Sequence, residues 1–65
     1  MDHIDRMKAE YEELDGRLND LSVFLHTNTF NGLSEESQWL LVEQHKCMKR
    51  YRNILNLRLI EALNR

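Results

Sequence analysis

One stretch of this sequence has residues of the right type and spacing to bind a ligand, the basic run Lys46-x-x-Lys49-Arg50-Tyr51-Arg52. Guanidinium and ammonium groups bind phosphate oxygens, and an aromatic ring can stack on a nucleobase. We therefore predict an anion site made of Lys46, Lys49, Arg50, Tyr51 and Arg52. On a helix these side chains do not share one face, and Tyr51 and Arg52 are expected nearest a partner helix. The competing interpretation is a solvated basic face that balances an acidic one.

Catalytic and metal-binding patterns are missing from the sequence. His45 and Cys47 are two positions apart, where helical side chains diverge, so they make neither a nucleophile–base pair nor half of a metal site. Cys47 is the single cysteine, which excludes an internal disulfide and fits a reducing compartment. We expect no enzyme, no metal and no cofactor, and His45 is expected to be a hydrogen-bonded structural residue.

A coiled-coil pattern near the N-terminus sets the fold that must position the basic run. Apolar residues recur three and four positions apart, as in a coiled-coil seam, at Ile4, Met7, Tyr11, Leu14, Leu18, Leu21 and Leu25. A helix built in this way needs a partner. We predict an all-α, antiparallel two-helix hairpin, a single domain over 1–65 with helices at about 2–26 and 35–63 and a turn at 27–34.

Capping and turn residues mark the ends of the two predicted helices. Asp2 or Asp5 can cap the first helix, and Ser34, followed by two glutamates, can cap the second. Asn31-Gly32 favours a break between them. We expect the tip of the hairpin to be closed by packing among Phe24, Phe30, Leu33 and Trp39.

The second predicted helix carries more apolar residues than one partner can cover. Near its end they nearly encircle the helix, and a helix that is apolar all round needs contact all round. A chain of 65 residues also buries little surface, about 60% of what it exposes when unfolded. We predict that the hairpins self-associate into a helical bundle through Ile54, Leu57, Ile60 and Leu63.

Charge is unevenly distributed along the chain. Residues 1–26 carry a net charge of −4 and residues 35–65 a net charge of +2. In an antiparallel hairpin the acidic block Glu10, Glu12, Glu13 and Asp15 falls beside Lys49, Arg50 and Arg52. Opposite charges at these positions favour this register over others.

The total charge and the hydropathy pattern limit the partners. A net charge of −2 argues against DNA or RNA as a partner, because nucleic-acid binding depends on a basic surface. The N-terminus lacks a basic start followed by an apolar run, and no stretch reaches the roughly 20 apolar residues of a membrane span. We therefore expect a cytoplasmic protein that does not enter a membrane.

The spacing of these residues resembles a group of short, mostly uncharacterised bacteriophage accessory proteins of the two-helix type. The resemblance covers nearly the whole chain and rests on the first-helix seam, on Phe30-x-x-Leu33, and on a less generic set in the second helix, Gln44, Met48, Tyr51 and Arg58. It implies a protein that acts by stoichiometric binding in host counter-defence, inside the host cell.

Two mechanisms then remain, beside a structural coiled-coil adaptor. In the first, a homo-oligomer sequesters an anionic nucleotide signal of host immunity, such as a cyclic nucleotide, at the basic run. In the second, the protein inhibits a host defence or regulatory protein directly, through Trp39, Glu12 and Glu13. Packing of Trp39 at the tip is weighed against this binding role, although tryptophan is enriched among interface hot spots.

Overall fold

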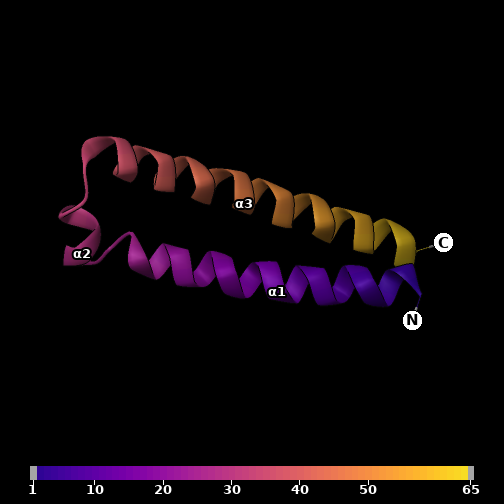
Figure 1. Ribbon diagram of the computed structural model, residues 1–65. Helices are drawn as coiled ribbons and strands as arrows, with labels where there is room; N and C mark the ends of the chain where they lie inside the picture. Colours follow the sequence, from indigo (N-terminus) through magenta and orange to yellow (C-terminus); the bar gives the residue numbers. More distant parts are fainter. Residues whose placement is uncertain (1, 65) are drawn as a thin grey trace.

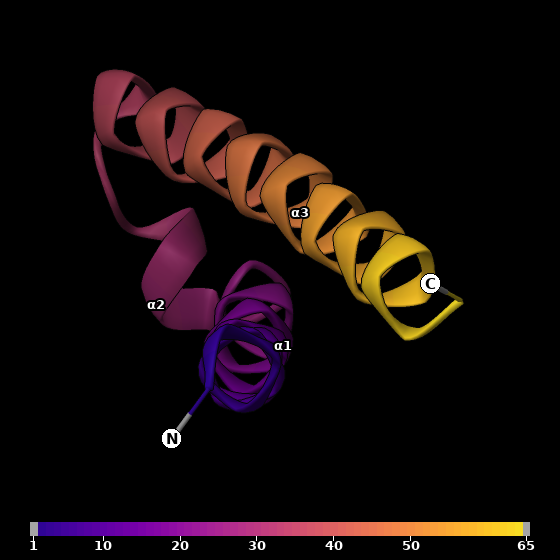
Figure 2. The same ribbon diagram turned by 90° about the vertical axis from the view of Figure 1, so that its right-hand side faces the viewer.

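The computed structural model describes residues 2–64, which form a hairpin of two long helices. The helices in this part of the chain are α1 (His3–Phe24), the one-turn α2 (Asn28–Asn31) and α3 (Glu35–Leu63). α1 and α3 run antiparallel and pack on each other, with α2 at the far end from His3 and Leu63 (Figure 1). α3 crosses α1 obliquely (Figure 2). The predicted all-α antiparallel hairpin is confirmed.

Side-chain caps fix the start of each long helix. An Asp2 carboxylate oxygen accepts a hydrogen bond from the Asp5 N–H at 2.9 Å, and the Ser34 hydroxyl accepts one from the Ser37 N–H at 3.1 Å. Both caps satisfy backbone donors that a helix leaves without partners. Of the two aspartates considered for α1, the structure uses Asp2 as the cap.

The tip contains a helical turn within the segment 27–34. The Thr27 hydroxyl accepts a hydrogen bond from the Phe30 N–H at 3.2 Å and donates one to the Phe24 carbonyl at 2.7 Å. This turn brings the rings of Phe24 and Phe30 together, edge to face, with centroids 6.2 Å apart. Phe30 therefore packs against Phe24 at the tip, as predicted.

Trp39 does not join that tip cluster, and this part of the prediction is wrong. Its side chain is 61% exposed. The half-buried Leu41 lies two positions further along α3, and residues two apart lie on different sides of a helix. Because α3 turns Leu41 inward, it turns Trp39 outward.

The core is a short row of side chains between α1 and α3. Met7, Leu18, Leu55 and Leu59 are buried, and Leu55 is fully so at 0% exposure. Other residues of the α1 seam, such as Leu14 and Leu21, are only half-buried, because two helices cannot enclose a wider core.

No helix in residues 2–64 has the length and apolar character needed to cross a membrane.

Most of the exposed apolar surface lies on α3. The exposed large apolar residues are Val23 on α1 and Trp39, Leu40, Tyr51, Ile54, Leu57, Ile60 and Leu63 on α3. The four residues predicted to form an oligomer interface are among them. Their exposure agrees with an available apolar surface, and self-association stays a prediction.

Candidate anion-binding groove

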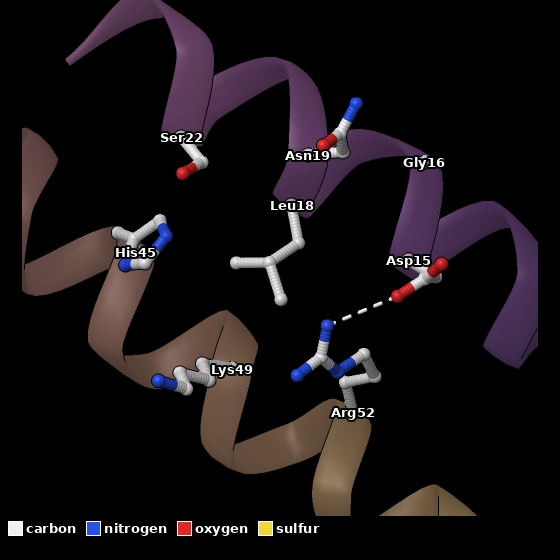
Figure 3. Close-up of a pocket in the computed structure, with 8 residues that line it drawn as sticks. All are labelled: Asp15, Gly16, Leu18, Asn19, Ser22, His45, Lys49 and Arg52. Atoms are coloured by element: carbon white, nitrogen blue, oxygen red, sulfur yellow. Dashed lines mark hydrogen bonds and ion pairs between the residues drawn. The ribbon is translucent and has the colours of Figure 1, made fainter. Parts of the chain in front are cut away.

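A polar groove of about 460 Å³ lies between the middle of α1 and the middle of α3. Its α3 side presents His45, Lys49 and Arg52, and its α1 side presents Asp15, Gly16, Leu18, Asn19 and Ser22 (Figure 3). In this view the Leu18 side chain extends between the two helices, among the polar groups. The groove therefore has polar walls and an apolar floor.

Helical spacing explains why these residues meet. His45, Lys49 and Arg52 are separated by four and three positions, which places them on one face of α3. Asp15 and Asn19 are likewise four positions apart on α1. Packing of the buried Leu18 against α3 then turns the two polar faces toward each other.

Positive charge exceeds negative charge in the groove. An Arg52 Nη1 group donates to an Asp15 carboxylate oxygen at 3.0 Å, and this ion pair joins the two helices. The Arg52 side chain is 26% exposed and that of Asp15 is 52% exposed. Lys49 has no hydrogen bond or ion pair with another residue in 2–64. One cation of the groove is therefore balanced by a carboxylate, and Lys49 is not.

The structure divides the five residues predicted to form the anion site. Lys49 and Arg52 share the groove. Lys46 lies outside it and forms an ion pair with Glu43 one turn earlier on α3, at 3.2 Å. Arg50 is exposed and also lies outside the groove.

Tyr51 lies on the opposite flank of the hairpin. Its hydroxyl donates a hydrogen bond to the Glu10 carboxylate, and the ring borders a shallow hollow of about 80 Å³ with Glu10, Glu13, Leu14 and Arg17. The hydrogen bond to Glu10, helped by partial desolvation and the Glu10 charge, raises the pKa of Tyr51. The predicted proximity of Tyr51 and Arg52 to α1 is confirmed, but the two residues face α1 from opposite sides of α3.

Three polar residues of the groove, His45, Asn19 and Ser22, were not predicted as site residues. His45 could have been found from sequence, because it completes a helical stripe with Lys49 and Arg52. Asn19 and Ser22 could not, since their place opposite that stripe depends on how α1 is rotated about its own axis.

The residues of the acidic block of α1 differ in their contacts, and Glu10 is the one that binds Tyr51. Asp15 reaches across to Arg52, as the charge distribution predicted. Glu13 instead binds Arg17 on its own helix at 2.6 Å. Glu12 is exposed.

The described residues contain no group of three or more histidine, cysteine, aspartate or glutamate side chains placed to hold a metal ion.

Fold and groove together define a class, a small helical hairpin protein with charged and polar side chains around a groove. The sequence profile of the Sequestin family matches residues 1–61, and the chain belongs to this family. By its name the family comprises sequestering proteins, which act as sponges for a molecule without converting it. The expectation of a non-enzymatic binding protein is therefore confirmed. Comparisons with curated proteins and with solved structures give no match.

Proposed function

We propose that this member of the Sequestin family sequesters a small anionic ligand of the nucleotide type in the groove between α1 and α3. In this proposal the protein is a homo-oligomer encoded by a phage, and the ligand is a signal of host immunity. The observation that carries the proposal is Lys49, which has no ion pair among residues 2–64, beside Arg52 in a groove of about 460 Å³, on a chain of net charge −2. Two cations and one carboxylate line the groove of a chain whose net charge is negative, and this excess of positive charge favours an anion as the ligand.

The size and chemistry of the groove support a ligand of this type. Small-molecule pockets are usually about 300–1,000 Å³, so the groove is large enough for a compact nucleotide. Arg52 offers N–H groups beyond the one bound to Asp15, and Lys49 offers an ammonium group, both suited to phosphate oxygens. Leu18 provides an apolar surface for a base or a sugar, and Asn19 and Ser22 provide hydrogen-bonding groups.

Binding to isolated protein tests this proposal directly. Purified protein is titrated by calorimetry with cyclic mononucleotides and cyclic dinucleotides, and the ligand is then recovered by denaturation and weighed by mass spectrometry. A sequestering protein binds a fixed number of ligands per chain and releases them chemically unchanged. If none of these compounds binds, or if they are recovered hydrolysed, the proposed ligand class or the proposed mode of action is wrong.

Matched lysine variants locate the site. Lys49→Ala removes the groove cation that has no ion pair in the described part of the chain, and it should weaken binding at least tenfold, since a charge-assisted hydrogen bond contributes about 1.5–3 kcal/mol. Lys46→Ala removes the same charge from the same helix, outside the groove, and should leave affinity within about twofold. Equal losses in the two variants would show that general charge, and not the groove, holds the ligand.

Asp15→Asn should change the affinity for the nucleotide in the opposite direction from Lys49→Ala. The carboxylate of Asp15 competes with an incoming anion for Arg52. Removing its charge should therefore tighten binding of the nucleotide that the wild-type protein prefers, while Asp20→Asn, an exposed control on α1, should not. Weaker binding by Asp15→Asn would show that the carboxylate contacts the ligand instead of competing with it.

A second candidate function, direct inhibition of a host protein, is favoured by the 61% exposure of Trp39. In that case Trp39→Ala, or charge reversal at Glu12 and Glu13, should reduce capture of the partner without loss of helix content. Native mass spectrometry of protein purified from infected cells separates the two functions. It reports a bound small molecule in the first case and a bound polypeptide in the second.

A further inference from the structure

A second apolar line runs along α3, beside the line that packs on α1. Leu40, Cys47 and Ile54 are exposed, and Leu40 and Ile54 expose 52% and 44% of their surface. Their spacing of seven positions is close to two helical turns, so the three side chains lie in one row. The side of α3 packed on α1 carries the buried Leu55 and Leu59, and the row lies beside that side.

The row lies on the flank of the hairpin away from the groove. Ile54 is three positions after Tyr51, and Cys47 is four positions before it, so both neighbour the tyrosine that borders the small hollow. The groove residues of α3, Lys49 and Arg52, border the other side of the contact with α1. Contact along the row would therefore leave the groove open.

The row is symmetric about Cys47. Leu40 is seven positions before Cys47 and Ile54 is seven positions after it. If a second α3 packs antiparallel, with a two-fold axis at Cys47, Leu40 of each copy lies against Ile54 of the other. Such an isologous contact buries Leu40, Cys47 and Ile54 of both chains with one set of side chains.

Charged residues beside the row distinguish an antiparallel pair of α3 helices from a parallel pair. Glu36 and Glu43 flank its N-terminal half, and Arg50 and Arg58 flank its C-terminal half. An antiparallel pair places acidic halves against basic halves, whereas a parallel pair places like charges together. Glu43 is bound to Lys46 within the hairpin, and Arg50 has no ion pair with a described residue.

We propose that two copies of this chain dimerise through α3, antiparallel, along the row Leu40, Cys47 and Ile54, with the two-fold axis at Cys47. The dimer is a four-helix assembly with one open groove on the outer flank of each subunit. Of the predicted interface residues, Ile54 lies in this contact, while Leu57, Ile60 and Leu63 lie outside the row. The inference names the partner surface for the homo-oligomer of the proposed function, but it does not depend on which ligand binds.

Cysteine cross-linking tests the direction of the contact. In a Cys47→Ser background, Leu40→Cys and Ile54→Cys chains are mixed, with one chain carrying a mass tag, and treated with a short bis-maleimide. The antiparallel dimer predicts that the mixed 40–54 product forms at least tenfold faster than either homodimer product. Asn53→Cys, an exposed neighbour of Ile54 on another side of α3, is the control and should cross-link slowly. Dominant 40–40 and 54–54 products, or equal rates for all pairs, would overturn the proposal.

A charge exchange tests the same contact without cysteine. Glu43→Arg and Arg50→Glu should each raise the dimer dissociation constant at least tenfold in sedimentation experiments, and the double variant should recover most of the loss. Circular dichroism checks that each variant keeps its helices. No loss in the single variants, or no recovery in the double variant, would contradict an antiparallel pair.

The two proposals fail separately. Lys49→Ala should dimerise normally and lose nucleotide binding. A wild-type protein that binds cyclic nucleotides but is monomeric at all concentrations would overturn the dimer, and with it the homo-oligomer of the proposed function, and would leave ligand binding in the groove standing. A dimer that forms the predicted cross-links but binds no cyclic nucleotide would overturn the proposed ligand and leave the dimer standing.

Discussion

The two long helices of the hairpin place their apolar residues differently. α1 exposes a single large apolar residue, Val23, which lies outside its seam, and directs the seam toward α3. α3 buries Leu55 and Leu59 but leaves seven large apolar side chains exposed, among them Leu57 at 63%. The two helices pack on each other, yet only α1 has its apolar surface accounted for by that contact.

This difference indicates that the helices have different tasks. α1 needs one partner, which the hairpin supplies, and its remaining surface is acidic and polar. α3 provides half of the core, one wall of the groove and an exposed apolar row. A hairpin is thus the smallest folded unit of this protein, while the surface of α3 is suited to a larger assembly.

The sharpest test of the contrast compares an inward and an outward leucine of α3. Leu55→Ala should lower the free energy of unfolding by about 2–5 kcal/mol, because it leaves a cavity at a fully buried site. Leu57→Ala removes the same atoms from an exposed site. It should change the free energy of unfolding of the dissociated chain by less than about 0.5 kcal/mol. Denaturant titrations followed by circular dichroism at low protein concentration measure both values. Similar losses in the two variants would mean that Leu57 is buried in the state being unfolded.

Gly16→Ala tests whether α1 is open to solvent at Gly16, on the edge of the groove. A Cβ atom at Gly16 would have no neighbour within 4 Å, so alanine fits without displacement. Alanine should raise the free energy of unfolding by about 1 kcal/mol, the usual difference between the two residues inside a helix. The exposed Ala9→Gly is the matched reverse change and should lower it by a similar amount. A destabilised Gly16→Ala protein would show that another chain approaches α1 at this point.

The Asp15–Arg52 bond tests the contact between the helices at the groove. A double-mutant cycle with Asp15→Ala and Arg52→Ala should give a coupling energy of about 0.2–1 kcal/mol, reduced by high salt, because the pair is partly exposed. The Glu13–Arg17 pair within α1 gives the comparison for a bond that joins no second helix. A coupling energy of zero for Asp15 and Arg52 would remove electrostatics as a determinant of the register.

The hydrogen bond of Tyr51 to Glu10 gives the smallest predicted effect on stability, and the direction in which that effect changes with pH follows from the pKa of Tyr51. Its pKa is raised in the folded chain by the hydrogen bond to Glu10, so the folded state binds the phenolic proton more tightly than the unfolded state. The stabilisation is therefore complete below the ordinary tyrosine pKa of about 10 and is lost as the pH rises through the higher folded value. Ultraviolet titration should show one tyrosine ionising late, and that component should vanish in Tyr51→Phe and remain in Tyr11→Phe. A late component that survives in Tyr51→Phe would contradict the assignment.

Much of the fold could be predicted from the sequence. The seam from Ile4 to Leu25, the Ser34 cap and the break at Asn31-Gly32 are local signals, each readable within a few residues. They predict two helices and the apolar face of each that packs on the other. The short connection between the helices makes them antiparallel. The charge difference between the two halves also predicted a bond from the acidic block to the basic run, which Asp15 and Arg52 form.

The candidate site could be predicted only in part. The basic run was visible as a cluster in sequence, yet Lys49 and Arg52 face the groove while Lys46, Arg50 and Tyr51 do not. Each residue turns a helix by about 100°, so neighbours in sequence separate in space. Which of them meet α1, and from which side, depends on how each helix is rotated about its axis.

The sequence by itself determined the helices, their caps and the inward face of α1, because these follow from interactions over three or four residues. Only the tertiary structure decided that Trp39 faces solvent, that Asp15 and not Glu13 reaches Arg52, and that Lys49 has no ion pair among the described residues. The physical reason is that these outcomes depend on the register and rotation of two packed helices. Both are set by how Met7, Leu18, Leu55 and Leu59 fit together, and that fit is a property of the packed pair and of neither helix alone.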